Sequence, residues 1–258
     1  MQERQKNRAL YFKELAQTSR KYFIPYIERF KQIREGMNVL EIGCGDGGNL
    51  LPFAEKGCTV VGVDMAESRI KDAIRFFAEF HAQGTFIASD VFKLTELENR
   101  FDIIICHDVL EHLDNKLTFL TGMKRFLNPE GVIFMSFPAW QMPFGGHQQI
   151  CKSKWASHLP FMHLLPNTAY RALLKAAGED APCINELMNI KRTRISIERF
   201  ESLLSEGKIR KVNREFYFIN PHYETKFHLT PRKLTPLIGA LPYVRNFFTT
   251  SCFYILRF

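Results

Sequence analysis

The chain has 258 residues, a formal net charge of +8 and 46% hydrophobic residues. That apolar content excludes disorder over most of the chain, and the length suits one large α/β domain or two small ones. No uncharged apolar run approaches the ~20 residues that a membrane span needs, and residues 1–8 lead into no signal-like run, so we expect a cytoplasmic protein.

The first predicted elements are helical. Residues 6–34 carry apolar side chains at spacings of three and four, among them Phe12, Leu15 and Phe23. Pro25 marks the start of a second helical segment, because a proline in the interior of a helix interrupts it. We therefore expect two helices before the first strand.

Five short apolar runs then alternate with amphipathic stretches. Helical spacing marks the stretches around residues 70–80 and 117–127. Strand–helix–strand repeats of this kind predict right-handed crossovers and a doubly wound sheet. The runs predicted to be buried parallel strands are Val39–Ile42, Cys58–Val63, Thr85–Ala88, Phe101–Cys106 and Val132–Ser136.

Residues 137–195 break this rhythm with prolines, paired glycines and both tryptophans. We interpret them as an insertion on the sheet. Two further strands are predicted at Ile209–Ile219 and Cys252–Leu256. Between those two strands, Thr230–Pro231 and Leu241–Pro242 each predict a helix start, with proline in the first turn.

The elements together predict a single α/β domain over residues 1–258. We expect a Rossmann-like, seven-stranded, mostly parallel sheet with helices on both faces, an N-terminal helical cap and an insertion after the fifth strand. The parts are the cap at 1–35, the first half of the sheet at 36–136, the insertion at 137–195 and the C-terminal strands and helices at 196–258.

A glycine-rich loop follows the first predicted strand. Gly43, Gly45 and Gly48 satisfy the pattern G-x-G-x-x-G, in which glycines let the backbone approach a ligand and the next helix offers free N–H groups. With Asp64 at the end of the second strand, the pattern also fits a dinucleotide-dependent oxidoreductase using NAD. A lone match of this kind is weak evidence.

Acidic residues separate the two interpretations. Glu41 lies two residues before the first glycine, where a dinucleotide fold normally continues an apolar strand, and Asp64 and Asp90 follow the second and third strands. Residues 106–113, Cys-His-Asp-Val-Leu-Glu-His-Leu, follow the fourth. In these four motifs, residues 38–136 resemble the class I S-adenosylmethionine-dependent methyltransferases, in particular the group similar to ubiquinone-biosynthesis O-methyltransferases.

The cofactor of that family suits the acidic residues. S-adenosylmethionine carries a sulfonium, an ammonium, two ribose hydroxyls and an exocyclic amine, and it has no phosphate that would need arginines. An acidic glycine loop would repel a pyrophosphate. Residues 36–136 would then be the cofactor-binding half, within a stretch, 36–190, that carries 13 Lys/Arg against 18 Asp/Glu.

The resemblance implies a role for each matching residue. The implied cofactor contacts are Glu41, Gly43, Cys44 and Gly45 around the methionine part, Asp64 on the ribose hydroxyls, Met65 on adenine, Asp90 with Val91 at the adenine amine, and His107 facing the methionine end. The plainer alternatives are that the aspartates cap helices, the glycines serve only the turn and Met65 is core. The N-terminal helices would close over the cofactor, with Lys21 and Tyr22 as candidate contacts.

Methyl transfer is an in-line displacement at carbon, so the protein must align the acceptor and, for a hydroxyl, remove a proton. His112 and His147 are the candidate bases, since histidine exchanges protons near neutral pH; both could instead brace their loops. Amine and amide methyltransferases commonly carry an Asn/Asp-Pro-Pro-aromatic tetrad after the fourth strand, and residues 107–110 depart from it. A small-molecule O- or C-acceptor is therefore favoured.

No metal is predicted, because histidine pairs five residues apart, such as His107 and His112, do not share a helix face. We expect the insertion to select the substrate, through an aromatic-walled pocket over the strand ends. The alternative is a second small core under a lid. The residues expected in the pocket are Trp140, Met142, Phe144, Trp155, Phe161, Met162 and His163.

The positive excess lies at the two ends of the chain. Residues 1–35 carry 9 Lys/Arg against 4 Asp/Glu, and residues 191–258 carry 13 against 5. Such ends suit an anionic, carrier-linked or lipid-linked acceptor, and also a nucleic-acid (RNA) methyltransferase, in which basic residues neutralise phosphates. Nucleic acid is the less favoured partner, because this segment has no recognisable nucleic-acid module.

An apolar stripe with basic neighbours runs through residues 234–248. It is compatible with an interfacial helix that handles a lipid-linked acceptor. Packing on the sheet or in a dimer interface is the favoured alternative, because Pro236 and Pro242 break the helix. We expect a monomer or a homodimer without a transmembrane segment.

Overall fold

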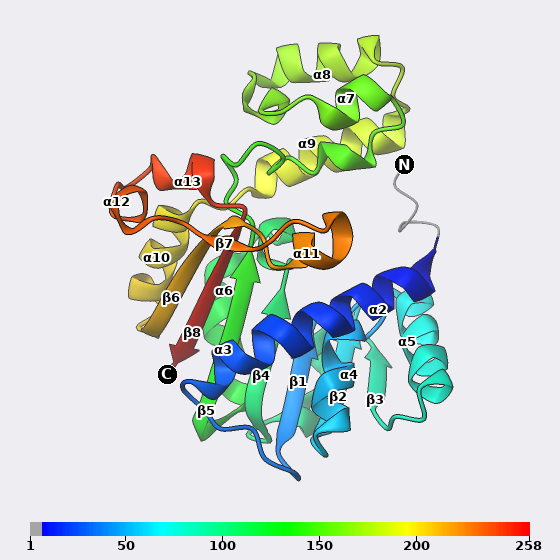
Figure 1. Ribbon diagram of the computed structural model, residues 1–258, viewed down its shortest axis with the longest axis vertical. Helices are drawn as coiled ribbons and strands as arrows, with labels where there is room; N and C mark the ends of the chain where they lie inside the picture. Colours follow the sequence, from blue (N-terminus) through cyan, green and yellow to red (C-terminus); the bar gives the residue numbers. More distant parts are fainter. Residues whose placement is uncertain (1–6) are drawn as a thin grey trace.

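The centre of the structure is a mixed eight-stranded sheet with the order β3-β2-β1-β4-β5-β8-β6-β7 (Figure 1). The computed structural model describes residues 7–258, so the first six residues of the predicted cap lie outside the described residues. β1 to β5 are parallel, and β8, β6 and β7 continue the sheet antiparallel. The strands are β1 Asn38–Ile42, β2 Thr59–Asp64, β3 Thr85–Ala88, β4 Phe101–His107, β5 Leu127–Phe137, β6 Arg210–Ile219, β7 Arg232–Lys233 and β8 Ser251–Arg257.

The predicted number of seven strands was wrong. All seven expected strands are present, and β7 is an eighth, which pairs with the edge of β6 between Lys233 and Tyr217. The helix expected at Thr230–Pro231 does not form there; the chain is extended instead, and the Leu234 N–H donates to the Phe216 carbonyl at 2.8 Å. Two residues are too short to show a strand pattern in sequence.

The strand order places a crevice at the carboxyl ends of β1 and β4. β1 has β2 on one side and β4 on the other, so the chain leaves β1 in one direction and later returns to its other edge. Open α/β sheets bind ligands at this switch point. The glycine loop that follows β1 therefore lies where such a sheet places a ligand.

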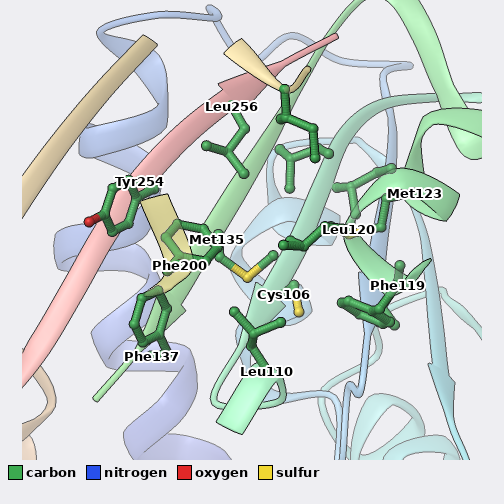
Figure 2. Packing of buried hydrophobic residues seen from close by; sticks show 14 of the residues in the cluster. Cys106, Leu110, Phe119, Leu120, Met123, Met135, Phe137, Phe200, Tyr254 and Leu256 are labelled. Carbon is green, nitrogen blue, oxygen red and sulfur yellow. The ribbon is translucent and has the colours of Figure 1, made fainter. Parts of the chain in front are cut away.

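Helices cover both faces of the sheet, as predicted. In β4, Ile104 and Cys106 join the apolar cluster on one face, whereas Ile103 and Ile105 join the cluster on the other, which is the two-residue period of a strand. Figure 2 shows the first cluster, where Leu120, Met135, Phe200 and Tyr254 pack around Cys106. Helices α6 (Lys116–Gly122) and α10 (Ile197–Glu206) cover this face, and α4 (Leu51–Glu55) and α5 (Glu67–Glu79) cover the other with the N-terminal helices.

The two expected N-terminal helices follow each other directly, with no loop between them (Figure 1). α2 (Arg8–Thr18) passes through a π-helical turn, η1 (Ser19–Phe23), into α3 (Ile24–Glu28). The Ile24 N–H donates to the Ser19 carbonyl, a five-residue step, immediately before Pro25. A local π-turn of this kind lets the helix continue past proline, which has no N–H to donate.

Gly48 permits α2 to pack on the glycine loop. A Cβ at Gly48 would lie 2.6 Å from the Phe12 carbonyl oxygen and 2.8 Å from the Leu15 Cβ. Gly48→Ala is therefore expected to lower the free energy of unfolding by about 1–3 kcal/mol, measured by chemical denaturation, because the extra methyl overpacks the contact. In the control Gly239→Ala the nearest atom would be 3.9 Å away, and little change is expected. An unchanged stability in Gly48→Ala would contradict the close packing.

The insertion lies over the carboxyl ends of the parallel strands (Figure 1). Its helices are α7 (Lys154–His158), α8 (Asn167–Ala176) and α9 (Ala181–Thr193), and they enclose a small apolar cluster of their own that includes Met162 and Tyr170. The remaining helices are the short α11 (His222–Phe227), α12 (Pro236–Gly239) and α13 (Arg245–Phe248). Within residues 7–258, no helix has the length and apolar character to cross a membrane.

Candidate functional site

The loop after β1 forms an open cradle. Gly43, Gly45 and Gly47 have φ values of +73°, +51° and +82°, in the left-handed region that glycine adopts without strain. A Cβ at Gly43 would come within 2.3 Å of Val109, whereas a Cβ at Gly45 would meet no atom within 4 Å. The backbone at Gly45 is thus exposed to a space that a ligand can enter.

Asp64 fastens this loop to the end of β2. Its Oδ2 accepts the Gly45 N–H at 2.9 Å, and its Oδ1 accepts the Ala66 N–H at 2.8 Å. Asp90, at the end of β3, caps the next turn by accepting the Phe92 N–H at 3.0 Å. Both aspartates therefore stabilise the local backbone, which was the plainer alternative for their role. A carboxylate has about four acceptor sites, so both also keep acceptor capacity toward a ligand.

A first cavity of about 340 Å³ lies beside these carboxylates. Four of the predicted cofactor residues besides Gly43 line it, namely Asp64, Met65, Asp90 and Val91. Met65 is 82% exposed, so the alternative that it is core is wrong. The sequence reasoning missed the opposite wall, which includes Leu113, Thr118 and Phe119 from the start of α6 and the loop before it. In the sequence, residues 117–127 indicated only a helix.

Three of the predicted cofactor residues lie behind the cradle, namely Glu41, Cys44 and His107. They line neither this first cavity nor the second one, which is described next. Glu41 is buried; its Oε1 accepts from Asn49 Nδ2 at 2.7 Å, and its Oε2 has no hydrogen-bond partner in the described part of the chain. Burial raises the pKa of Glu41 to about 8. The His107 ring packs on Phe23, with ring centroids 5.0 Å apart.

A second cavity of about 590 Å³ lies on the other side of the glycine loop and is lined by Gly45. Its walls come from several separate parts of the chain. They include Arg8 and Tyr11 of α2, Asp108 and His112 after β4, Met142, Phe144 and His147 of the insertion, and Asn220, His222, Tyr223 and Lys226 in and before α11. The sequence identified the two histidines and the insertion residues, but not the contributions of α2 and α11.

The N-terminal helices close one side of this second cavity. Lys21 and Tyr22, proposed as cofactor contacts, instead bind Glu224 of α11, and the Tyr22 hydroxyl donates to its Oε2 at 2.6 Å. Asp46, in the glycine loop, is buried and forms ion pairs with Arg8 and Arg69. These contacts hold α2 and α11 over the loop.

His112 and His147 meet at a buried carboxylate. Their ring centroids are 5.1 Å apart, and the Nε2 atom of each lies 3.9 Å from Glu111 Oε1. Neither carboxylate oxygen of Glu111 has a hydrogen-bond partner in residues 7–258. Burial raises the pKa of Glu111 well above its usual range and lowers the pKa of His147 to about 4. Burial thus favours the neutral carboxyl of Glu111, and the His147 imidazole is neutral near pH 7.

The backbone around these histidines is constrained. His147 and Asp108, which both line the second cavity, have φ values of +56° and +53°. Side-chain-bearing residues rarely adopt this left-handed region, and such strain gathers at functional sites. Glu111 belongs to the sequence motif that follows β4. Its closeness to His147 could not be predicted from the sequence, because it depends on how the insertion folds over the sheet.

Within residues 7–258, two groups of side chains have ligand atoms close enough together to hold a metal ion. The ligand atoms of Glu111, His112 and His147 lie within 4.8 Å of one another, as do those of Cys151, Glu179 and Cys183 in the insertion. Histidine pairs close in sequence do not share a helix face, but the fold brings His147 to residues 111–112 from a distant part of the chain. The absence of a metal stays a prediction.

The aromatic pocket expected in the insertion forms only in part. Met142 and Phe144 line the second cavity, but Met162 is buried in the cluster of the insertion itself. Trp155 and Phe161 are 51% and 40% exposed. The insertion therefore combines a pocket wall with the small separate core of the alternative interpretation.

His163 is fully buried within the insertion. Its ring packs edge-on against Trp140, and its Nε2 lies 2.8 Å from the Trp140 carbonyl oxygen, as a donor in the matching tautomer. Burial lowers the pKa of His163 from 6.5 to about 4. Between these two values the unfolded chain binds a proton that the folded chain does not, so folding stability falls as pH drops through this window.

His163→Gln is expected to remove this contribution. Between pH 6.5 and pH 4, its stability should fall by roughly 2–3 kcal/mol less than that of the unsubstituted protein, measured by denaturation at each pH. His158→Gln, at an exposed histidine in α7, is the control and should leave the pH dependence unchanged. Parallel pH profiles for His163→Gln and the unsubstituted protein would contradict the burial argument.

Comparisons with known proteins identify the family of this chain. A methyltransferase domain family matches residues 12–180, well over half of the chain. The ubiquinone biosynthesis O-methyltransferase of Coxiella burnetii is 33% identical over 113 residues, which cover 44% of this chain and 48% of that protein. The first curated relatives are matched over 39–49% of their length, so the chain spans less than half of each.

Two solved structures share the fold over nearly the whole chain. The plantazolicin methyltransferase in complex with SAH has a TM-score of 0.56 and 14% identity, covering 97% of this chain and 85% of that one. The magnesium protoporphyrin IX methyltransferase of Synechocystis has a TM-score of 0.53 and 16% identity, covering 94% and 82%. With the motifs after β1 to β4 and the family match, these likenesses show that the chain belongs to the methyltransferase domain family, as a class I S-adenosylmethionine-dependent methyltransferase.

Proposed function

We propose that this protein transfers a methyl group from S-adenosylmethionine to an oxygen or carbon atom of a small-molecule acceptor, by in-line displacement. The observation that carries the proposal is that two cavities meet at one glycine loop. Gly43 lines the cavity with the strand-end carboxylates, and Gly45 lines the cavity with the histidines. A cofactor in the first cavity can thus present its reactive end to an acceptor in the second.

The residues of the first cavity fit the proposed cofactor. Asp64 and Asp90 offer carboxylate acceptors to ribose hydroxyls and to the adenine amine, and exposed Met65 offers an apolar surface to the ring. The open backbone at Gly45 leaves room for the methionine part. Glu41 lies behind the loop with one unpartnered oxygen and adds negative charge once ionised. When bound, S-adenosylmethionine supplies a methyl group activated by a sulfonium.

The residues of the second cavity can remove a proton from a hydroxyl acceptor. Burial lowers the pKa of His147 to about 4, so its imidazole is neutral near pH 7 and free to accept that proton. A positive imidazolium at His147 would favour the ionised form of Glu111, 3.9 Å away. We therefore assign His147 as the base, with His112 on the same carboxylate as the second candidate.

The RNA alternative loses its main support in this structure. Basic residues that motivated it are used in ion pairs: Arg192 with Asp114, Arg199 with Glu206 and Arg214 with Glu201. The NAD-dependent alternative rested on the glycine pattern alone. The comparisons support neither alternative. For the oligomeric state, our proposal is a monomer or a homodimer.

Calorimetric titration tests the proposed cofactor. S-adenosylhomocysteine, the product left after methyl transfer, is expected to bind with micromolar affinity and to raise the melting temperature. NADH should give neither heat nor a change in its fluorescence. Heat with NADH and none with S-adenosylhomocysteine would overturn the proposal.

A further inference from the structure

A group of large apolar side chains is exposed around α12 and α13. We call this group the C-terminal apolar face; it comprises Leu237, Leu241, Tyr243, Val244, Phe247 and Phe248, each between 40% and 77% exposed. Packing on the sheet, one of the two alternatives favoured from sequence, was therefore wrong for these side chains, and the other, a dimer interface, stays a prediction. Monomeric proteins rarely gather so many exposed apolar side chains without a partner for them.

The face continues onto the insertion. The Phe247 ring lies 6.4 Å from the Phe161 ring between centroids, and Phe161 is itself 40% exposed. Figure 1 shows α13 on the side of the molecule that faces the insertion. Segments 86 residues apart in the sequence, at Phe161 and Phe247, thus contribute to one surface.

The two segments that form this surface contain no acidic residue. Residues 225–258 carry five Lys/Arg and no Asp/Glu, and residues 131–178 carry four Lys/Arg and no Asp/Glu. Some of these cations are paired from elsewhere, since Lys233 binds Glu215 and Arg245 binds Glu198. Arg232 and Lys154 also belong to these segments, so each segment carries a net positive formal charge of its own.

This combination favours one class of partner. A second copy of the chain would place two positive surfaces against each other, which like charges oppose. RNA would supply the negative charge, but Leu237, Leu241 and Val244 have no ring on which a base could stack. An anionic lipid surface offers both negative headgroups and an apolar layer for aliphatic and aromatic side chains.

We propose that the C-terminal apolar face docks on anionic lipid membranes, with Leu237 and Phe247 entering the headgroup–acyl boundary and Arg232 and Lys233 at the headgroups. Leu237 and Tyr243 are the most exposed of the set, at 77% and 69%. The docking is peripheral, because α12 and α13 are each four residues long. The sequence idea of an interfacial helix is thus replaced by a loop with two short helical turns.

A groove lined by residues of α7 and α11 bears on the kind of acceptor. A cavity of about 580 Å³ is lined by Phe227 and Leu229 and by Lys152 and Lys154. It shares Phe144, Gln149, Tyr223 and Lys226 with the histidine-lined cavity. This part of the inference rests on the proposed function: the acceptor would be an amphiphile, with an apolar portion in the groove and an anionic group near the lysines.

Vesicle sedimentation tests the docking independently of catalysis. The full chain is expected to pellet with phosphatidylcholine vesicles that contain about a third phosphatidylglycerol, to stay in solution with phosphatidylcholine alone, and to bind less as salt rises. Leu237→Gln should weaken binding about tenfold or more, and Arg232→Gln several-fold. Ile74→Gln on α5, also an exposed apolar position at 53%, is the matched control and should bind normally.

The other occupants give distinct results. Equal binding of Leu237→Gln and Ile74→Gln, or no binding to anionic vesicles, would overturn the proposal. A dimer in solution that Leu237→Gln dissociates would identify a second copy as the partner, and displacement of vesicles by RNA would identify a nucleic acid. All variants should bind S-adenosylhomocysteine alike, so a failure of the membrane proposal is distinguishable from a failure of the proposed function.

Discussion

Asp64→Ala is expected to weaken S-adenosylhomocysteine binding about a hundredfold or more. The substitution removes the acceptor for the Gly45 N–H at 2.9 Å, which holds the cradle, and the acceptor proposed for the ribose hydroxyls. Hydrogen bonds to a charged group each contribute about 1.5–3 kcal/mol, so losing two of them reaches this factor. Isothermal titration calorimetry measures the change directly.

Two further variants make this result specific. Asp64→Asn keeps one acceptor oxygen and should show an intermediate loss. Glu67→Ala removes a nearby exposed carboxylate that pairs with Lys71, and it should leave the affinity unchanged. If Asp64→Ala bound S-adenosylhomocysteine as tightly as Glu67→Ala, Asp64 would serve only the turn, as the plainer interpretation holds.

His147→Gln is expected to lower kcat by about a hundredfold to ten-thousandfold, the contribution of a well-placed general base. The side chain lines the acceptor cavity and does not line the cavity proposed for the cofactor, so S-adenosylhomocysteine affinity should be unchanged. The assay is transfer of labelled methyl to any hydroxyl-bearing acceptor that supports turnover. Because His147 loses its base form below its pKa of about 4, the rate of the unsubstituted enzyme should fall only below about pH 5.

Glu111→Gln distinguishes a positioning carboxylate from a merely structural one. Glu111 lies 3.9 Å from both histidines, and its ionised form would stabilise an imidazolium. Burial favours the neutral carboxyl of Glu111, so Glu111→Gln keeps the resting charge of the site. It should lower kcat by removing the carboxylate that can form beside the imidazolium, with the acid limb of the pH profile and the affinity for S-adenosylhomocysteine kept. Recovery of part of the rate in Glu111→Asp would support the positioning role, equal rates in Glu111→Gln and Glu111→Asp would indicate a structural role, and full activity in His147→Gln would exclude His147 as the base.

The neighbourhood of the proposed cofactor cavity was predictable from sequence because its signals are local. The glycine loop, Asp64 and Asp90 each stand at the end of a strand that its own apolar run marks. A parallel sheet brings such strand ends to one edge, so their neighbourhood follows from topology alone. The acidic middle of the chain, unlike the global charge of +8, pointed to the right class of ligand.

The acceptor side was less predictable because it is assembled over long separations. Glu111 and His147 meet only after the insertion folds over the sheet, and α11 reaches the cavity from residue 222 onward. The two-residue strand β7 depends on pairing with β6 rather than on a pattern of its own. The periodicity of residues 234–248 could not distinguish an exposed apolar stripe from a buried one, because the spacing is the same in either environment.

A crystal structure with S-adenosylhomocysteine tests the central claim most directly. The account predicts density for adenine in the cavity between Met65, Asp90 and Phe119, ribose at Asp64, and the sulfur at the glycine loop, directed toward the cavity of His147. Ligand density elsewhere, or a sulfur directed away from that cavity, would contradict it.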